Sequence, residues 1–435
     1  MVSRTVLDNG IRIVSEEIDH VRSISIGIWV ESGSRHENDV NNGTAHFIEH
    51  MLFKGTKRRS AFEIAAAIDS VGGIMNAATG KESTSFYIKI PDFHIETAVD
   101  LLADIFLSSR FDEDDINKER AVVLQEIRMA EDEPGDYIYD LFEGLFWKEH
   151  PLGLHILGSK ERVASLHRDG LLSFFHDRYK GKNLVIAAAG HLKHAHIVEL
   201  IEKAFRTLPD LEIVDQIEAP APQAGTAIFY KELEQAHLIV GATAPAAIDD
   251  GRHAAFLLNA VLGGSMSSRL FQEIREKRGL AYDVGSYLTS YRDAGIFGVY
   301  VATQAATLKE TLGVIKEELA RCAAELISEK ELNSAKELLK GNYLLGMENT
   351  DNRMTGLARN EIYFGRQITP EEVVSRIDAV QREEIRSLAE RIFRDDALAV
   401  AALGPVSQKD LTGEAIAKPF VIPECLYREY GFSSS

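Results

Sequence analysis

The sequence predicts an α+β protein of two similar domains that arose by internal duplication, each an antiparallel sheet packed with long helices. Three stretches of the first half resemble three stretches of the second half in the same order. Strand-like and helix-like apolar periods are mixed within each half. The length of 435 residues, with 45% hydrophobic residues, suits two or more globular domains with their own cores.

The first pair of similar stretches is an apolar helical pattern that ends at glycine. Residues 46–56 read HFIEHMLFKGT, and residues 255–265 read AFLLNAVLGGS. Each stretch is followed by a phenylalanine on a further helical pattern, Phe62 in the first half and Phe271 in the second. The two stretches therefore align without a gap.

Two further pairs follow in the same order. Residues 111–118 and 327–334 both begin helices with acidic residues in the first turn, where the helix dipole favours them. Residues 184–190 and 398–404 are short apolar runs that end in glycine, as buried strands do.

These matches predict a second domain built like the first. We expect a first domain at 1–212 and a second at 226–435. The linker at 213–225 contains Pro220, Pro222 and Gly225, which interrupt any periodic pattern.

Within the first half, strand-like and helix-like stretches are mixed. Residues 11–16 and 23–31 alternate as hairpin strands do, and so do residues 83–90, with Phe86, Ile88 and Ile90 on one face. Helical periodicity covers five stretches: 45–53, 61–71, 94–108, 114–130 and 137–147.

The composition argues against one class of partner and against disulfide bonds. The formal net charge of −19 argues against nucleic acid as a partner, because phosphates attract Lys and Arg. The charge suits basic peptide substrates, or it serves solubility alone. The two cysteines, Cys322 and Cys425, predict no disulfide framework and suit a reducing compartment.

The N-terminus and the hydropathy predict a cytoplasmic protein with no membrane partner. The first ten residues have no apolar signal core, and no stretch approaches the roughly 18 apolar residues of a membrane span. A precursor whose targeting segment has been removed is the alternative.

A metal-binding pattern lies in the first stretch. His46 and His50 are four residues apart on a predicted helix, so both imidazoles point from one face and reach one ion. Glu49 adjoins them without being needed as a ligand. This His-x-x-Glu-His order is the inverted zincin pattern. A motif this short also arises by chance, and the alternative is two surface histidines.

A catalytic zinc needs three protein ligands and an open position for water. Glu119 and Glu126, seven residues apart on the predicted helix 114–130, face the same way and are both candidates for the third ligand. The alternative for these glutamates is a solvated acidic face.

The duplication offers an independent test. The positions opposite His46, Glu49, His50 and Glu126 in the second half are Ala255, Leu258, Asn259 and Asn342. The apolar frame persists there without its imidazoles and carboxylates, as expected if only the first copy holds metal.

These motifs resemble the pitrilysin/insulinase-type zinc metallopeptidases, in the branch of the mitochondrial processing peptidase subunits and their bacterial relatives. The resemblance covers nearly the whole chain. It is carried by residues 7–10 (LDNG), 43–56, 76–79, 119–127, 131–134 and 270–282.

The resemblance implies a zinc endopeptidase with one Zn²⁺ per chain, although His/His/Glu sites accept several divalent ions. His46, His50 and Glu126 match the family's ligands, and Glu49 matches its base. Glu119 matches a second acidic residue near the metal, whose role would be to orient a ligating histidine.

Arg275 and Tyr282 match an Arg and a Tyr, seven residues apart, that reach the active site from the second type of domain. In half-length family members that domain belongs to the partner subunit. The resemblance therefore implies a homodimer with a composite active site. The alternative is that Arg275 is a surface charge and Tyr282 a core aromatic.

The resemblance also implies how a peptide substrate binds. Asn76, Ala77 and Thr79 match a strand edge that holds an extended peptide by main-chain hydrogen bonds. One feature departs from the family: the glycine-rich loop of the non-catalytic mitochondrial subunit is reduced to residues 263–265. Recognition of mitochondrial presequences through that loop is therefore in doubt.

The implied mechanism is metal-assisted hydrolysis of peptides, including unfolded or processing substrates. Glu49 would move the proton of the attacking water, and Tyr282 and Arg275 would donate to the oxyanion. The rivals are a non-catalytic scaffold of the same fold and a partner subunit that needs a different chain. The sequence does not fix the cleavage site.

Overall fold

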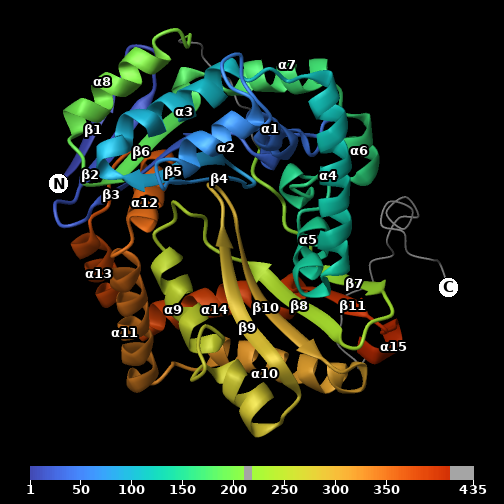
Figure 1. The fold of residues 1–435 in the computed structure, drawn as a ribbon. Coiled ribbons are helices and arrows are strands. Elements are labelled where there is room, and N and C mark those ends of the chain that lie inside the picture. Colours follow the sequence, from blue (N-terminus) through green and yellow to red (C-terminus); the bar gives the residue numbers. More distant parts are fainter. Residues whose placement is uncertain (210–217, 412–435) are drawn as a thin grey trace. The chain divides into compact units, whose positions relative to one another are not determined.

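The computed structural model describes residues 1–209 and 218–411, which form two compact units (Figure 1). Unit 1 comprises Met1–Met129, Leu154–Glu218 and Leu345–Ile368. Unit 2 comprises Ala130–Gly153, Ala219–Leu344 and the chain from Thr369 onward.

Unit 1 contains a six-stranded sheet in which only β2 and β6 are parallel neighbours. β4 lies at one edge of this sheet and β1 at the other. The order across the sheet is β1 (Val2–Val6), β2 (Arg12–Glu17), β6 (Leu184–Gly190), β3 (Ser23–Val30), β5 (Thr84–Pro91) and β4 (Ile74–Thr79).

The five-stranded sheet of unit 2 repeats this order from β2 onward, with one parallel pair, β7 and β11, at the same place. The shared order and strand senses are what an internal duplication produces. The order is β7 (Gly225–Tyr230), β11 (Ala399–Gly404), β8 (Ala236–Thr243), β10 (Gly295–Thr303) and β9 (Ala281–Ser290). The sheets are thus antiparallel except where the last strand of each half lies beside its first.

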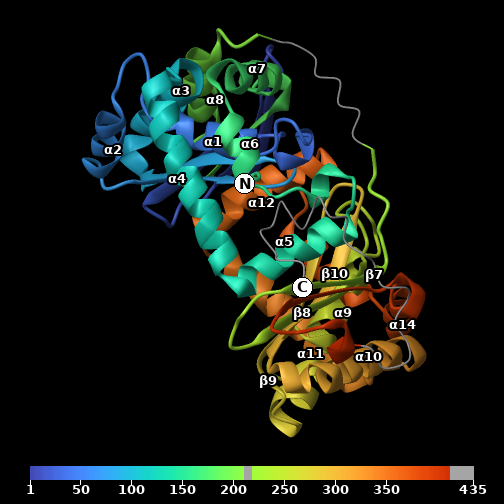
Figure 2. The ribbon, with the colours of Figure 1, turned by 90° about the vertical axis from the view of Figure 1, so that its right-hand side faces the viewer.

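Both faces of the unit 1 sheet are covered by helices. Ile24, Ile26 and Ile28 of β3 face a core shared with α1 (Thr44–Leu52) and α3 (Ile95–Ser108). The opposite face packs against α12 (Thr350–Phe364), which comes from the second half of the sequence. Figures 1 and 2 show α12 across the strands from α1 and α3.

Unit 2 has the reciprocal arrangement. One face of its sheet packs against α9 (Arg252–Leu262), α10 (Leu308–Ala324) and α14 (Arg382–Ile392). The other face packs against α5 (Pro134–Phe146), which comes from the first half. A Cβ atom at Gly241 would lie 2.2 Å from the Phe142 ring, so β8 needs glycine where α5 crosses it.

The compact units therefore do not coincide with the continuous domains expected at 1–212 and 226–435. Each half of the sequence places one helix on the other half's sheet. A helical apolar period shows that one face is buried, but not which sheet buries it. Part of the expected linker, 213–217, lies outside the described residues; residues 218–224 form no helix or strand before β7 begins.

The remaining helices complete the two units, and α4 and α11 each cross a boundary between them. Their bounds are α2 Ala61–Asp69, α4 Glu113–Asp132, α6 Lys160–Ser165, α7 Arg168–Arg178, α8 His194–Phe205, α11 Glu329–Gly346, α13 Pro370–Ala379, α15 Gln408–Leu411, the π-helical turn η5 Phe271–Lys277, and the 3-10 turns η1 Ser34–His36, η2 Asp92–His94, η3 Pro151–Gly153, η4 Gly181–Asn183, η6 Ala305–Thr307 and η7 Asp395–Ala397.

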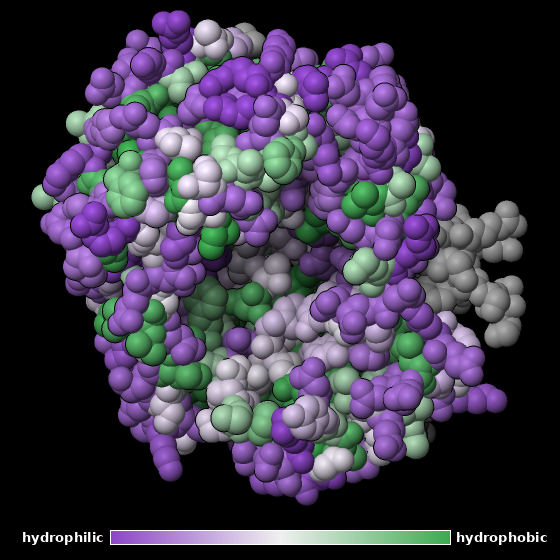
Figure 3. Space-filling view, in the orientation of Figure 1, coloured by the Kyte–Doolittle hydropathy of each residue, from purple (hydrophilic) through white to green (hydrophobic). Residues whose placement is uncertain are grey.

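Within residues 1–209 and 218–411, no helix has the length and apolar character needed to cross a membrane. The face drawn in Figure 3 carries mostly hydrophilic side chains, with hydrophobic ones scattered among them.

Candidate metal centre

Helices α1 and α4 bring two imidazoles and a carboxylate together in unit 1. The Nε2 atoms of His46 and His50 lie 3.2 Å apart. Glu126 Oε2 lies 3.8 Å from His46 Nε2 and 3.4 Å from His50 Nε2. Among the described residues, this is the one group of three such side chains placed to share an ion.

The donor set and its spacing fit zinc. A tetrahedral zinc with bonds of about 2.0–2.2 Å holds its ligand atoms about 3.3–3.6 Å apart, close to the separations found here. Without a cation, the lone pairs of the imidazole nitrogens and the carboxylate would face one another unfavourably. Two histidines and one glutamate leave a fourth position for water or substrate.

Glu119 orients one of the two histidines. Its Oε1 accepts a hydrogen bond from His50 Nδ1 at 2.8 Å. His50 Nε2 is then left to face His46 and Glu126, and these three residues together are the metal cluster. Its Oε2 lies 2.6 Å from Lys54 Nζ. Burial alone would raise the pKa of Glu119, but the hydrogen bonds from His50 and Lys54 hold it below its usual value. Glu119 therefore stays charged and supports His50.

His46 is held differently. The side chain is buried, and its Nδ1 has no hydrogen-bond partner among the described residues. Burial, together with the neighbouring His50, lowers the pKa of His46 to about 3. The imidazole is thus neutral near pH 7, as a metal ligand must be.

Glu49 lies on α1 next to His50 and contacts the end of the edge strand β4. The hydroxyl of Thr79, the last residue of β4, donates a hydrogen bond to Glu49 Oε2. Burial raises the pKa of Glu49, and the Thr79 hydrogen bond partly opposes that rise. A carboxylate with a raised pKa beside the cluster suits a general base.

Asn76 and Ala77 lie on the same edge strand. β4 pairs with β5 on one side only, and Asn76 is exposed. The amide of Ala77 donates to the side-chain Oδ1 of Asn76 at 2.9 Å. The structure thus groups Asn76, Ala77 and Thr79 on one strand and brings only Thr79 against Glu49.

Arg275 and Tyr282 lie in unit 2 and contact each other. The Arg275 guanidinium lies 4.2 Å from the Tyr282 ring centroid, and its NH1 donates to the Tyr282 carbonyl at 3.1 Å. Tyr282 is 76% exposed, so the reading of this residue as a core aromatic is wrong.

In the second copy, the positions equivalent to His46, Glu49 and His50 are occupied by residues that pack or form one hydrogen bond. Ala255 and Leu258 on α9 are fully buried. Asn259 Oδ1, at the position of His50, accepts a hydrogen bond from Ser286 on β9 at 2.7 Å. The part of α9 that corresponds to the histidines of α1 therefore carries buried apolar side chains and one hydrogen-bonded amide.

One residue that contacts the start of α1 was not identified from the sequence. Glu37, 3% exposed, accepts hydrogen bonds from the backbone amides of Gly43 and Ala45 at the start of α1. Burial raises the pKa of Glu37 to about 7. The sequence held no signal for this role, because the helix predicted at 45–53 follows Thr44, itself a common N-cap residue, whereas α1 begins one residue earlier, after Gly43.

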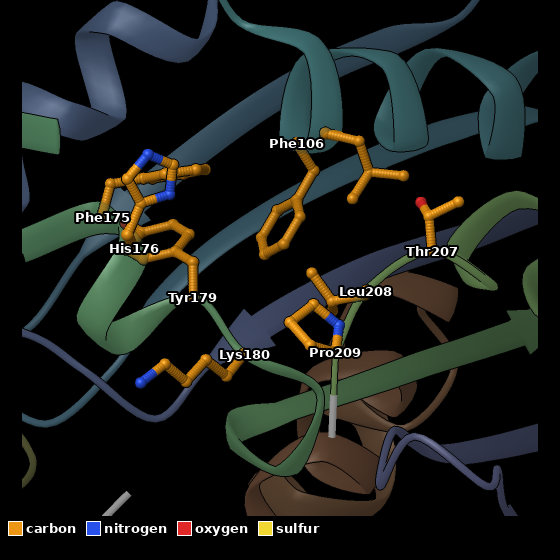
Figure 4. Close-up of a pocket in the computed structure, with 9 residues that line it drawn as sticks. Phe106, Phe175, His176, Tyr179, Lys180, Thr207, Leu208 and Pro209 are labelled. Carbon is orange, nitrogen blue, oxygen red and sulfur yellow. The ribbon is translucent and has the colours of Figure 1, made fainter. Parts of the chain in front are cut away.

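Unit 1 also has an open pocket of about 250 Å³ that shares no residue with the metal cluster (Figure 4). Its lining is mostly aromatic and aliphatic: Phe106, Leu107, Phe175, His176, Tyr179, Lys180, Thr207, Leu208 and Pro209.

Two family models match this chain. The model for insulinase (peptidase family M16) matches residues 12–160, and the model for the peptidase M16 inactive domain matches residues 165–339. The first match contains His46, His50 and Glu126, and the second contains Ala255, Leu258 and Asn259, which stand where the first half has His46, Glu49 and His50.

The chain is also similar to bacterial proteins named as uncharacterized zinc proteases. It is 41% identical over 405 residues to one from Bacillus subtilis (strain 168), covering 93% of this chain and 98% of the relative. It is 38% identical over 419 residues to one from Streptomyces coelicolor, covering 94% of this chain and 90% of the relative.

Solved structures share the fold. A protease from Helicobacter pylori superposes with a TM-score of 0.85 at 24% identity, covering 93% of this chain and 99% of that one. A protein from Pseudomonas fluorescens described as a peptidase M16 inactive domain gives a TM-score of 0.87 at 21% identity, covering 93% and 98%.

Proposed function

This chain belongs to peptidase family M16, the insulinase family, and on that premise we propose that it is a zinc-dependent endopeptidase with its active site on α1 and α4. The names of its relatives support a zinc protease as the general activity. The observation that carries the finer proposal is the convergence of His46, His50 and Glu126, with Glu49 beside them.

We assign one zinc ion per chain to the three ligands. The metal would belong to the first repeat, 1–212, while the second, 226–435, serves without metal. When bound, zinc supplies Lewis acidity to the attacking water and to the scissile carbonyl.

Glu49 acts as the general base in this proposal. Its carboxylate takes a proton from the attacking water and later passes that proton to the leaving amine. The Thr79 hydroxyl holds Glu49 through a hydrogen bond to Oε2. Glu119 keeps His50 in the tautomer whose Nε2 binds metal.

The substrate peptide would bind along β4. The open edge of this strand ends at Thr79, next to the base, so a peptide added there is delivered to Glu49. The Ala77 amide contacts only the exposed Asn76 side chain on that side, and a substrate carbonyl can replace that contact. Main-chain pairing suits peptides or unfolded processing substrates.

Arg275 and Tyr282 would complete the site as donors to the developing oxyanion. Their support is the resemblance of their spacing, the contact between them and the exposure of Tyr282. In a homodimer these donors would come from the partner chain. The processing-peptidase-like type of specificity rests on the motif resemblance alone.

The test is metal-dependent cleavage by the purified chain. A fluorescence-quenched peptide library is digested before chelation, after removal of metal, and after zinc is restored. His46→Ala is the matched control, because it removes one ligand and leaves Glu49. We expect cleavage that depends on zinc and is absent in the variant. Zinc binding without cleavage would favour a scaffold or a partner subunit instead.

A further inference from the structure

Helix α1, which carries both histidines, begins without a side-chain cap. Its N-cap is Gly43, with a φ of 91° and no side chain to accept a hydrogen bond. A Cβ atom there would lie 2.8 Å from the Leu157 carbonyl oxygen and 3.0 Å from Gly158 Cα. The usual capping residues Ser, Thr, Asp and Asn are therefore excluded from this position.

Glu37 supplies the missing acceptor from outside the helix. Its Oε1 accepts from the Ala45 amide at 2.6 Å. Its Oε2 accepts from the Gly43 amide at 2.8 Å and from Asn42 Nδ2 at 3.1 Å. Both oxygens are used, and a carboxylate at a helix N-terminus is also favoured by the helix dipole.

The buried surroundings leave Glu37 little freedom. Its relative exposure is 3%, and that of Asn42 is 5%. Asn42 in turn donates to the His155 carbonyl at 2.9 Å, which ties the carboxylate to a second loop. The first turn of α1 is thus held by the buried Glu37 carboxylate, which Asn42 in turn connects to the loop at His155.

The two histidines differ in how they are held. His50 has its Nδ1 bound by Glu119, whereas His46 Nδ1 has no partner among the described residues. His46 follows Ala45 directly, so its position depends on the backbone that Glu37 fixes. Within the part of the chain that the structure describes, no hydrogen bond at Nδ1 holds the His46 ring in place if that turn shifts.

We propose that Glu37 is a positioning residue for His46, setting the ligand geometry of the metal cluster through the first turn of α1. The inference rests on the proposed zinc site. Glu37 holds His46 in position through the backbone of α1, whereas Glu119 holds His50 in position through a side-chain hydrogen bond.

The test compares Glu37→Gln with Glu361→Gln. Glutamine keeps the size of Glu37 but turns one acceptor into a donor that opposes a backbone amide. Glu361 is an equally buried carboxylate of unit 1, 1% exposed, bound to Arg4 at 2.8 Å and placed on α12. It controls for the loss of a buried charge.

Zinc affinity is measured by competition with a chromophoric chelator, and the visible spectrum of the cobalt-substituted protein reports ligand geometry. For Glu37→Gln we expect zinc affinity to fall by about tenfold, the cobalt bands to shift, and kcat to fall with KM unchanged. Glu361→Gln should lower the melting temperature and leave affinity and spectrum at wild-type values.

A wild-type affinity and spectrum in Glu37→Gln, with only a lower melting temperature, would make Glu37 a structural residue and overturn the inference. If Glu37→Gln does not fold, Glu37→Asp is measured instead. Its shorter side chain cannot reach both amides, so the same losses are expected and the same outcome overturns the idea. If wild-type protein and His46→Ala bind zinc equally weakly, the zinc site itself is wrong.

Discussion

At the residue scale, the proposed metal site depends on the side chains that hold His46, His50 and Glu126 in place as well as on these three residues. Glu119 is buried between His50 and Lys54, and its charge is stabilised by both. A metal-bound histidine whose second nitrogen loses its acceptor binds more weakly, because its ring is free to turn.

Replacing Glu119 by Gln should therefore lower zinc affinity by roughly 10- to 100-fold. The affinity is measured by chelator competition. Glu113→Gln, an exposed acid on the same helix α4, should leave the affinity unchanged. Equal affinities for the two variants would contradict the role of Glu119.

The hydroxyl of Thr79 tunes the base. Burial raises the pKa of Glu49, and the hydrogen bond from Thr79 lowers it again. Thr79→Val removes the donor while keeping the shape, so the pKa of Glu49 should rise. Because a base must be deprotonated to act, the acid limb of the kcat/KM profile should move to higher pH. A limb that stays in place or moves to lower pH would show that Thr79 does not act on the base.

Sequence spacing could predict the residues that lie close together on helices. His46, Glu49 and His50 share one turn of α1, and the seven-residue interval from Glu119 to Glu126 fixes one face of α4. Glu37 and the contact of Thr79 with Glu49 could not be predicted, since both depend on loops and strand ends brought together by the tertiary fold.

At the scale of elements, helix periods predicted where helices form but not where they pack. The expected helices at 114–130 and 137–147 correspond to α4 and α5, yet α5 covers the sheet of unit 2. The first strand, β1, was not predicted at all, because its exposed edge position gives only a weak apolar alternation. The strand order across each sheet required the structure as well.

The exchange of helices has a testable consequence. A fragment of residues 1–212 lacks α12 and would expose the apolar sheet face that Val14, Trp29 and Val185 share with Met354 and Leu357. We expect this fragment to be insoluble or unfolded when made alone, and to be recovered when made together with 213–435. Circular dichroism and size-exclusion chromatography check this. A monodisperse, folded fragment would show that α12 is dispensable.

At the scale of the whole molecule, the proposed composite site makes a prediction about mixed dimers. Glu49→Gln lacks the base, and Tyr282→Phe lacks the oxyanion donor. If each site takes its tyrosine from the partner chain, a mixed dimer contains one complete site. Dissociating and reassociating equal amounts should restore about a quarter of wild-type activity. Activity that stays at the level of the separate variants would place both groups in one chain, or exclude the dimer.

The central claim is that Glu49 is the base of a zinc peptidase, and one side-by-side measurement tests it most directly. Zinc content and cleavage of a quenched peptide library are determined for wild type and Glu49→Gln. The account predicts about one zinc per chain in both proteins and cleavage only by the wild type. Near-normal turnover in Glu49→Gln would contradict it.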